Sequence, residues 1–190
     1  MSVAGVVLAA GAGSRFGGPK ALAADPDGTR WLPRAVQSLR AGGCEPVIVV
    51  LGASEDEART LVGNTVVVAT ASGWATGISS SIATALETVA SLPEVDAIAI
   101  VPVDVPSLSA AMVARLIGAK PDDRHALRQA TFEGRPGHPV IIGRSHWRAL
   151  AAQLASQEAR DAGAREYLAA HGVLELECSD LGSGDDVDAR

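Results

Sequence analysis

The stretch VAGVVLAAGAGSRFGGPK covers residues 3–20, and it decides the fold. Its first part, residues 3–10, is a continuous apolar run, which is typical of a parallel strand buried on both faces. A glycine-rich loop follows directly. Glycines let consecutive backbone N–H groups approach and surround one anion. The stretch therefore predicts a central strand followed by a phosphate-binding loop.

The rest of the chain alternates strand and helix patterns. The expected strands are residues 3–10, 46–52, 64–70, 96–104, 125–132, 138–143 and 173–178, and the expected helices are residues 32–43, 54–63, 78–92, 110–119, 145–155 and 162–170. Such alternation implies parallel strands joined by right-handed crossovers. We therefore expect an α/β fold with one domain over residues 1–190, a three-layer α/β/α sandwich around a mostly parallel, Rossmann-like sheet.

Composition and charge exclude several classes of protein. Hydrophobic residues make up 47% of the chain and charged residues 20%, which predicts a folded domain. The net charge of -6 gives no basic surface for nucleic acid or for an anionic membrane. No secretory signal or long apolar stretch is visible. We expect a cytoplasmic protein without nucleic-acid or membrane partners, in which Cys44 and Cys178 stay reduced.

Two well-known phosphate-binding loops do not match the glycine-rich stretch. The dinucleotide fingerprint needs a third glycine, and this chain has Phe16 there. The Walker A loop needs a lysine directly after its second glycine and then a hydroxyl residue. Here Pro19 precedes Lys20, and Ala21 follows it. What remains is a loop whose Arg15 can bind phosphate oxygens in a fork while Lys20 adds a point charge.

The loop and four later motifs resemble one family. L-A-A-G-x-G-x-R-[MF]-G-x-x-K is the signature loop of MobA-like nucleotidyltransferases, and the sequence is most similar to the molybdenum cofactor (molybdopterin) cytidylyltransferase group. The other motifs are W-x-x-G-I-x-x-S at residues 74–81, V-D-V-P at 103–106 in place of G-D-M-P, G-R-P-G-H-P at 134–139 and D-A-G-A-R at 161–165. All five follow the family's order along the chain.

The resemblance implies a reaction and a nucleotide site. The phosphate of an acceptor would attack the α-phosphorus of a nucleoside triphosphate, and pyrophosphate would leave, with Mg²⁺ as cofactor. Arg15 and Lys20 would stabilise the leaving pyrophosphate, and Asp104 would hold Mg²⁺. These three would be the catalytic residues. The implied nucleotide contacts are Leu8, Ala9, Ala10, Gly11, Gly13, Arg15, Lys20, Ser81 and Asp104.

The resemblance also implies an acceptor site and a second metal ligand. Gly137, His138 and Arg165 would contact the acceptor, and Asp180 would join Asp104 at the metal. The acceptor would be molybdopterin or its molybdenum form, and a molybdenum hydroxylase would receive the product. The A-A-G of the first motif resembles the cytidylyl branch, which favours CTP over GTP. A methyl group at Ala10 would narrow the space beside the base.

Several of these residues have simpler interpretations. Asp104 could cap the following helix or form a turn. His138 could be a half-buried residue of a hairpin connection, and Ser81 could be one more serine in the first turn of its helix. Arg165 could be a solvated cation. The loop itself could be a flexible connection between strand and helix.

Three departures from the family pattern bear on function. Where the family usually ends with D-x-D-T-P-[DE]-D, the corresponding run at 180–186 has Gly182 as its third residue. Ala71 replaces a common asparagine, and Val103 replaces the glycine before the acid. These changes leave two alternatives open, a nucleotidyltransferase for another phosphorylated metabolite such as a sugar phosphate, and a non-catalytic carrier of nucleotide or cofactor. A dinucleotide-dependent oxidoreductase ranks last because of Phe16.

Overall fold

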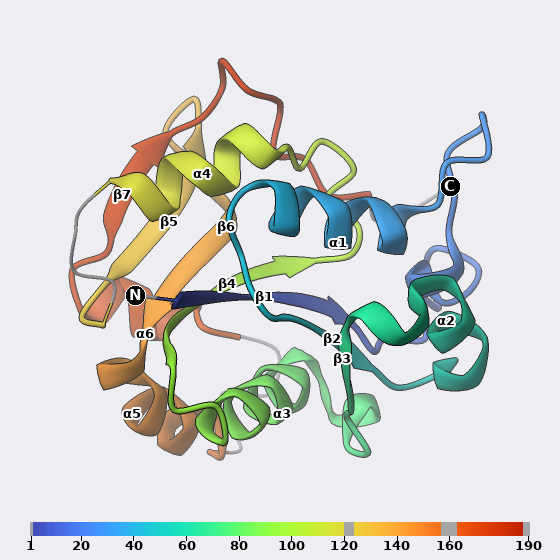
Figure 1. Ribbon diagram of the computed structural model, residues 1–190, viewed down its shortest axis with the longest axis horizontal. Coiled ribbons are helices and arrows are strands. Elements are labelled where there is room, and N and C mark those ends of the chain that lie inside the picture. Colours follow the sequence, from blue (N-terminus) through green and yellow to red (C-terminus); the bar gives the residue numbers. More distant parts are fainter. Residues whose placement is uncertain (1, 120–123, 157–162, 188–190) are drawn as a thin grey trace.

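The computed structural model describes residues 2–119, 124–156 and 163–187, and Figure 1 shows them as a layered α/β protein. These residues form a seven-stranded sheet with the order β3-β2-β1-β4-β6-β5-β7. The strands are β1 (Ser2–Ala9), β2 (Val47–Leu51), β3 (Val67–Thr70), β4 (Val95–Pro102), β5 (Leu127–Phe132), β6 (Arg135–Gly143) and β7 (Leu174–Glu177). Only β6 runs against the others within the described residues, so the sheet is mostly parallel, as expected.

Helices cover both faces of the sheet and complete the three-layer sandwich (Figure 1). They are α1 (Trp31–Ala41), α2 (Glu55–Val62), α3 (Ile78–Ala90), α4 (Ala110–Gly118), α5 (Arg144–Leu154) and α6 (Arg165–Ala170). Apolar residues of α1, α2 and α4 pack into one core, and those of α3, α5 and α6 pack into the other. Among the described residues, no helix is both long and apolar enough to cross a membrane.

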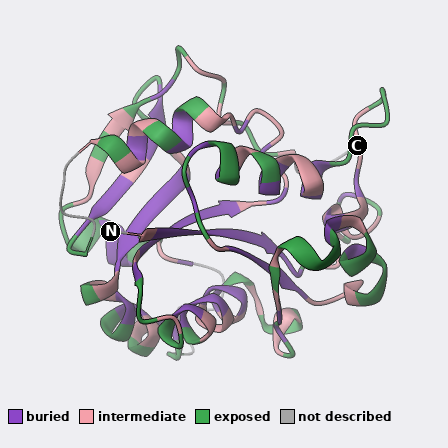
Figure 2. Ribbon diagram, in the orientation of Figure 1, coloured by how far each residue is buried: buried purple, intermediate pink, exposed green. Residues whose placement is uncertain are grey.

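The middle of the sheet is buried on both faces, which Figure 2 shows in purple. In β1, Val7 and Ala9 belong to one core, and Val6 and Leu8 belong to the other. This two-sided burial is the reason that the strand is apolar at consecutive positions. Leu8 pairs with Pro102 of β4. The loops that follow β1 and β4 therefore lie side by side at the carboxyl end of the two strands.

The structure corrects the expected turn at EGRPG. We expected a turn over this segment and a strand from residue 138, but β6 already begins at Arg135. The hairpin loop is confined to Glu133 and Gly134, whose φ angles are 52° and 73°. Two residues with positive φ match the twist of a tight hairpin, so no longer turn is needed.

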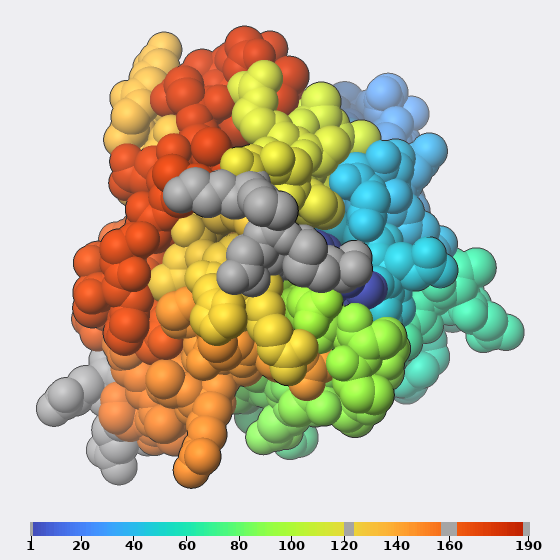
Figure 3. Space-filling model, turned by 60° about the vertical axis from the view of Figure 1, so that its left-hand side comes forward, coloured from blue at the N-terminus to red at the C-terminus, as the bar shows by residue number. Residues whose placement is uncertain are grey.

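Two other boundaries also differ from the pattern. β3 is shorter than expected, because Gly63–Thr65 forms a 3-10 turn before it. The last helix begins at Arg165, and the expected start at 162 lies outside the described residues. After it, β7 pairs with β5 at the edge of the sheet, where Figure 3 shows the red C-terminal segment along one side of the molecule.

Candidate active site

A cavity of about 470 Å³ lies at the carboxyl ends of β1 and β4. Its walls come from these strand ends, from the glycine-rich loop and from the start of α3. In open parallel sheets, ligands bind in this position. The structure brings all the residues expected to contact the nucleotide to this one cavity: Leu8, Ala9, Ala10, Gly11, Gly13, Arg15, Lys20, Ser81 and Asp104.

The glycine-rich loop is a folded turn and not an idle connection. The Gly13 carbonyl accepts hydrogen bonds of 3.0, 3.0 and 3.1 Å from the backbone N–H groups of Phe16, Gly17 and Gly18. Gly13 has a φ of 59°, and a Cβ there would lie 1.9 Å from the carbonyl oxygen of Gly18. Only glycine fits such a position. Phe16 fixes the far side of the turn by packing on Trp31, with ring centroids 5.3 Å apart.

Lys20 and Asp104 form an ion pair on the wall of the cavity. The distance from Lys20 Nζ to Asp104 Oδ2 is 2.5 Å, and the side chains are only 17% and 15% exposed. Lys20 begins the 3-10 turn after the glycine-rich loop, and Asp104 follows β4. Parallel pairing of β1 with β4 brings these two residues together. Arg15 lies on the same wall, where it is exposed.

The start of α3 forms a second wall. Ser81 is 5% exposed and lines the cavity one turn into the helix. Trp74 adds an aromatic surface. A Cβ at Gly52 would lie 2.7 Å from Cγ of Trp74, so glycine at the end of β2 is what lets the indole ring pack there. The sequence motif contained Trp74, but motif spacing alone gave it no role.

His138 lies close to Asp104 and to the C-terminal segment. Burial lowers the pKa of His138, and the charge of Asp104, the Ile100 carbonyl and the charge of Asp186 act in the opposite direction. Its buried Nδ1 has no hydrogen-bond partner among the described residues. This nitrogen is closed off from solvent, and His138 does not line the strand-end cavity. Gly137 has a packing role, since a Cβ there would lie 2.8 Å from the Phe132 ring.

The structure does not bring Asp180 to the cavity. Its two carboxylate oxygens accept hydrogen bonds of 2.6 and 2.7 Å from Arg115 of α4, on the surface of the protein. This bidentate pair holds the pKa of Asp180 below its ordinary value. In this arrangement Asp180 does not line the cavity with Asp104, and its role as a metal ligand stays a prediction.

The C-terminal segment reaches Asp104 through its backbone. The backbone N–H of Val187 donates a 3.0 Å hydrogen bond to the carbonyl of Asp104, and the charge of Asp186 acts on His138. The spacing D-x-D also occurs at residues 186–188. The sequence comparison matched the family's C-terminal motif from residue 180 and therefore did not consider this second possibility. Asp188 lies outside the described residues.

The departures at Gly182, Ala71 and Val103 have packing reasons. A Cβ at Gly182 would lie 2.5 Å from Cε of Met112 and 3.1 Å from the Ser107 carbonyl oxygen, so a side chain at this position would require the Met112 side chain to move. Ala71 is fully buried, and its carbonyl accepts a hydrogen bond from the Trp74 N–H at the turn before α3. Val103 is 5% exposed and joins one of the two cores.

The segment before α6 borders the cavity without lining it. A Cβ at Gly163 would lie 3.4 Å from Cγ2 of Ile78, which is a cavity residue. Arg165 starts α6 in an exposed position beyond this contact. Residues 161 and 162 of the same motif lie outside the described residues.

The side chains fit a magnesium ion that is held together with phosphate. Among the described residues, no group of three or more His, Cys, Asp or Glu side chains could hold a metal by itself. Mg²⁺ is usually bound through one or two carboxylates, with water and substrate phosphates completing its shell. Asp104, which lines the cavity, supplies a hard oxygen ligand of this kind.

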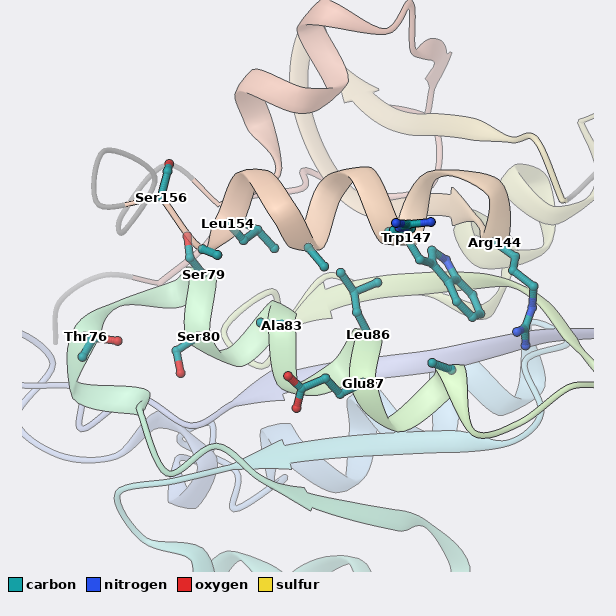
Figure 4. A pocket seen from close by; sticks show the side chains of 14 residues that line it. Thr76, Ser79, Ser80, Ala83, Leu86, Glu87, Arg144, Trp147, Leu154 and Ser156 are labelled. Carbon is teal, nitrogen blue, oxygen red and sulfur yellow. The ribbon is translucent and has the colours of Figure 1, made fainter.

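A larger cavity of about 660 Å³ lies between α3 and α5 (Figure 4). Much of its wall is apolar, with Leu86, Trp147 and Leu154 among the residues that line it. Arg144 is already engaged, since its Nε donates a 2.6 Å hydrogen bond to the Val95 carbonyl and its guanidinium lies over the Trp147 ring. This cavity therefore offers a poorer setting for phosphate chemistry than the strand-end cavity.

The fold and the strand-end cavity define a nucleotidyltransferase-type α/β protein. A model of the MobA-like NTP transferase domain matches residues 5–174, and the chain belongs to this family. The chain is similar to the nicotine blue oxidoreductase of Paenarthrobacter nicotinovorans, with 34% identity over 196 residues, covering 98% of this chain and 92% of that protein. That relative carries the name of an oxidoreductase, the class ranked last from the sequence.

Solved structures give the same fold. Rv0371c from Mycobacterium tuberculosis H37Rv matches with a TM-score of 0.78 and 26% identity, covering 100% of this chain and 94% of that one. A manganese complex of Rv0371c matches with a TM-score of 0.71 and 24% identity over 93% of this chain and 88% of that one.

Proposed function

We propose that the protein is a Mg²⁺-dependent cytidylyltransferase that transfers CMP from CTP to the phosphate of a molybdopterin-type acceptor and releases pyrophosphate. The observation that carries the proposal is the meeting of Arg15, Lys20 and Asp104 on the wall of one strand-end cavity. Membership of the MobA-like NTP transferase family supports the reaction class. The manganese complex of Rv0371c supports use of a divalent metal.

The proposed chemistry needs alignment and charge neutralisation more than covalent help. An oxygen of the acceptor phosphate attacks the α-phosphorus of CTP, and the bond from this phosphorus to the bridging oxygen of the β-phosphate breaks. Arg15 and Lys20 stabilise the negative charge on the leaving pyrophosphate. Asp104 would hold Mg²⁺, which when bound would neutralise phosphate charge.

Other cavity residues would select the substrates. The methyl group of Ala10 would narrow the space beside the base, and the Trp74 ring offers a flat surface for a base or a pterin. Gly137, His138 and Arg165 would contact the acceptor, as the family resemblance implies. The product would then pass to a molybdenum hydroxylase in the cytoplasm.

Pyrophosphate release tests this proposal. The protein is incubated with Mg²⁺ and either CTP or GTP, with and without molybdopterin. We expect release with CTP only when molybdopterin is present. Release that requires a different phosphorylated acceptor, such as a sugar phosphate, would support the alternative transferase. Binding of CTP without release from any acceptor would support the carrier.

The name of the 34% identical relative favours one further candidate, an oxidoreductase. The form of this candidate weighed from the sequence is one that uses a nicotinamide dinucleotide. The loop sequence speaks against it, because Phe16 stands where the dinucleotide fingerprint needs its third glycine. Titration of NADH and NADPH separates the two candidates. A change in nicotinamide fluorescence on binding would favour the oxidoreductase, and no change would leave the transferase.

A further inference from the structure

We infer that Lys20 blocks Asp104 against a free divalent cation, so that metal and nucleotide enter the cavity together and not metal first. This inference rests on the proposed function, because it assigns Asp104 to the metal and Lys20 to the triphosphate. It goes further by giving Lys20 a second task, which it performs before any substrate is bound.

The geometry of the ion pair carries the inference. Lys20 Nζ lies 2.5 Å from Asp104 Oδ2, and neither side chain is more than 17% exposed. Mg²⁺ needs oxygen ligands at about 2.0–2.1 Å, so it cannot reach this carboxylate oxygen while the ammonium group is in place. Repulsion between two cations at such a distance is also strong where water is partly excluded.

The side chain of Lys20 can leave without a change of the backbone. Ala21 beside it is 2% exposed, and the 3-10 turn is closed by a 3.1 Å hydrogen bond from the Ala23 N–H to the Lys20 carbonyl. The anchored backbone contrasts with a flexible four-carbon stem. A triphosphate in the cavity would offer the ammonium group several negative oxygens, and movement toward them would free Asp104.

Arg15 provides an internal comparison. It lines the same cavity, but it is exposed, and among the described residues no ion pair joins it to a carboxylate. Removing the charge of Arg15 should weaken nucleotide binding only. Removing the charge of Lys20 should weaken nucleotide binding and strengthen binding of the metal alone.

Coupling between the two ligands follows by linkage. If the nucleotide raises the affinity for the metal by some factor, the metal raises the affinity for the nucleotide by the same factor. Part of this coupling would come from displacement of Lys20. The coupling should therefore shrink when position 20 has no charge.

Binding of Mn²⁺ to the full chain, measured by electron paramagnetic resonance without nucleotide, tests the inference. We expect Lys20→Met to bind Mn²⁺ about tenfold more tightly than the native protein, within the usual range of coupling between sites. Lys20→Arg, which keeps the charge, and Arg15→Met should both stay at the native affinity. Lys20→Gln repeats the test with a polar side chain if the methionine variant does not fold, as judged by its thermal unfolding.

Calorimetry of CTP binding, with and without Mn²⁺, completes the experiment. We expect Mn²⁺ to tighten CTP binding to the native protein about tenfold, and to tighten it less in Lys20→Met. The inference would be overturned if the native protein, Lys20→Met and Lys20→Gln all bound Mn²⁺ alone with equal affinity. The proposed function would survive that result if the native protein still bound CTP with Mn²⁺. Failure of the native protein to bind CTP under any of these conditions would remove both.

Discussion

The strand-end cavity and the larger cavity between α3 and α5, which we call the groove, differ in both size and charge. The groove is larger, at about 660 against 470 Å³, but Arg144 in its wall is already engaged by backbone carbonyls and a tryptophan ring. The smaller cavity gathers Arg15, Lys20 and Asp104 from segments that are distant in the sequence. Convergent charge, more than volume, is therefore the reason that we propose the strand-end cavity as the site of phosphate chemistry.

Removal of the Asp104 charge should cause the largest loss of activity, because it removes the feature that distinguishes the strand-end cavity from the groove. A metal ligand contributes several kcal/mol of charge stabilisation, so Asp104→Asn should lower kcat/KM by roughly 10³-fold. Pyrophosphate release at saturating Mg²⁺ measures the effect. The fold should be retained, because Asp104 is not part of either core. Turnover within tenfold of the native rate would contradict a metal role for Asp104.

A side chain at Gly13 should damage the loop that forms the cavity. Gly13→Ala combines a φ of 59° with a contact of 1.9 Å to the Gly18 carbonyl oxygen. The expected cost is about 1–3 kcal/mol of unfolding free energy, measured by chemical denaturation. The matched control is Gly11→Ala, where a Cβ would meet nothing within 4 Å. Equal losses of unfolding free energy in Gly13→Ala and Gly11→Ala would show that the turn at Gly13 is not the cause of the destabilisation.

The methyl group of Ala10 should contribute to the discrimination between CTP and GTP. Ala10→Gly would widen the cavity next to the strand end, and one methyl group is worth about tenfold in discrimination. We expect the ratio of kcat/KM for CTP to that for GTP to fall by about this factor. Steady-state kinetics with each nucleotide gives the ratio. An unchanged ratio would place base selection elsewhere, with Trp74 as the next residue to vary.

Changes in the groove and at the outer carboxylate should have the smallest effects. Arg148 lines the groove and is exposed, and Asp180 is held by Arg115 on the surface. Neither lines the strand-end cavity. Arg148→Ala and Asp180→Asn should both keep kcat/KM within about twofold, as surface substitutions remote from a site usually do. A large loss of kcat/KM in Asp180→Asn would support a metal-binding role for Asp180, despite its position outside the strand-end cavity.

Sequence reasoning was most successful where local pattern and function coincide. The run of residues 3–10 must be apolar at every position because both faces of β1 are buried, and the pattern shows it directly. The motif residues at 8–20, 81 and 104 lie around one cavity because β1 and β4 are parallel neighbours with their carboxyl ends together. A parallel arrangement was already implied by the alternation of elements.

The C-terminal region could not be placed in the same way. Asp180 and Asp186 are equally acidic in the sequence, and only the path of the chain separates them. The turn at Gly182 and Gly184 passes close to Met112 and Phe132, which leaves Asp180 outside and carries Asp186 toward His138. These are contacts between distant segments, and they have no periodic signal. The start of β6 at Arg135 was missed because the motif's glycines and prolines suggested a longer turn.

The central claim is that the strand-end cavity joins CMP to a phosphorylated acceptor, and the mass of the product tests it most directly. Molybdopterin, CTP and Mg²⁺ are incubated with the native protein or with Asp104→Asn, and the pterin species are analysed by mass spectrometry. The account predicts a pterin whose mass is increased by one cytidylyl group in the native reaction, and unmodified molybdopterin with the variant. Unmodified molybdopterin in both reactions, or the same adduct in both, would contradict it.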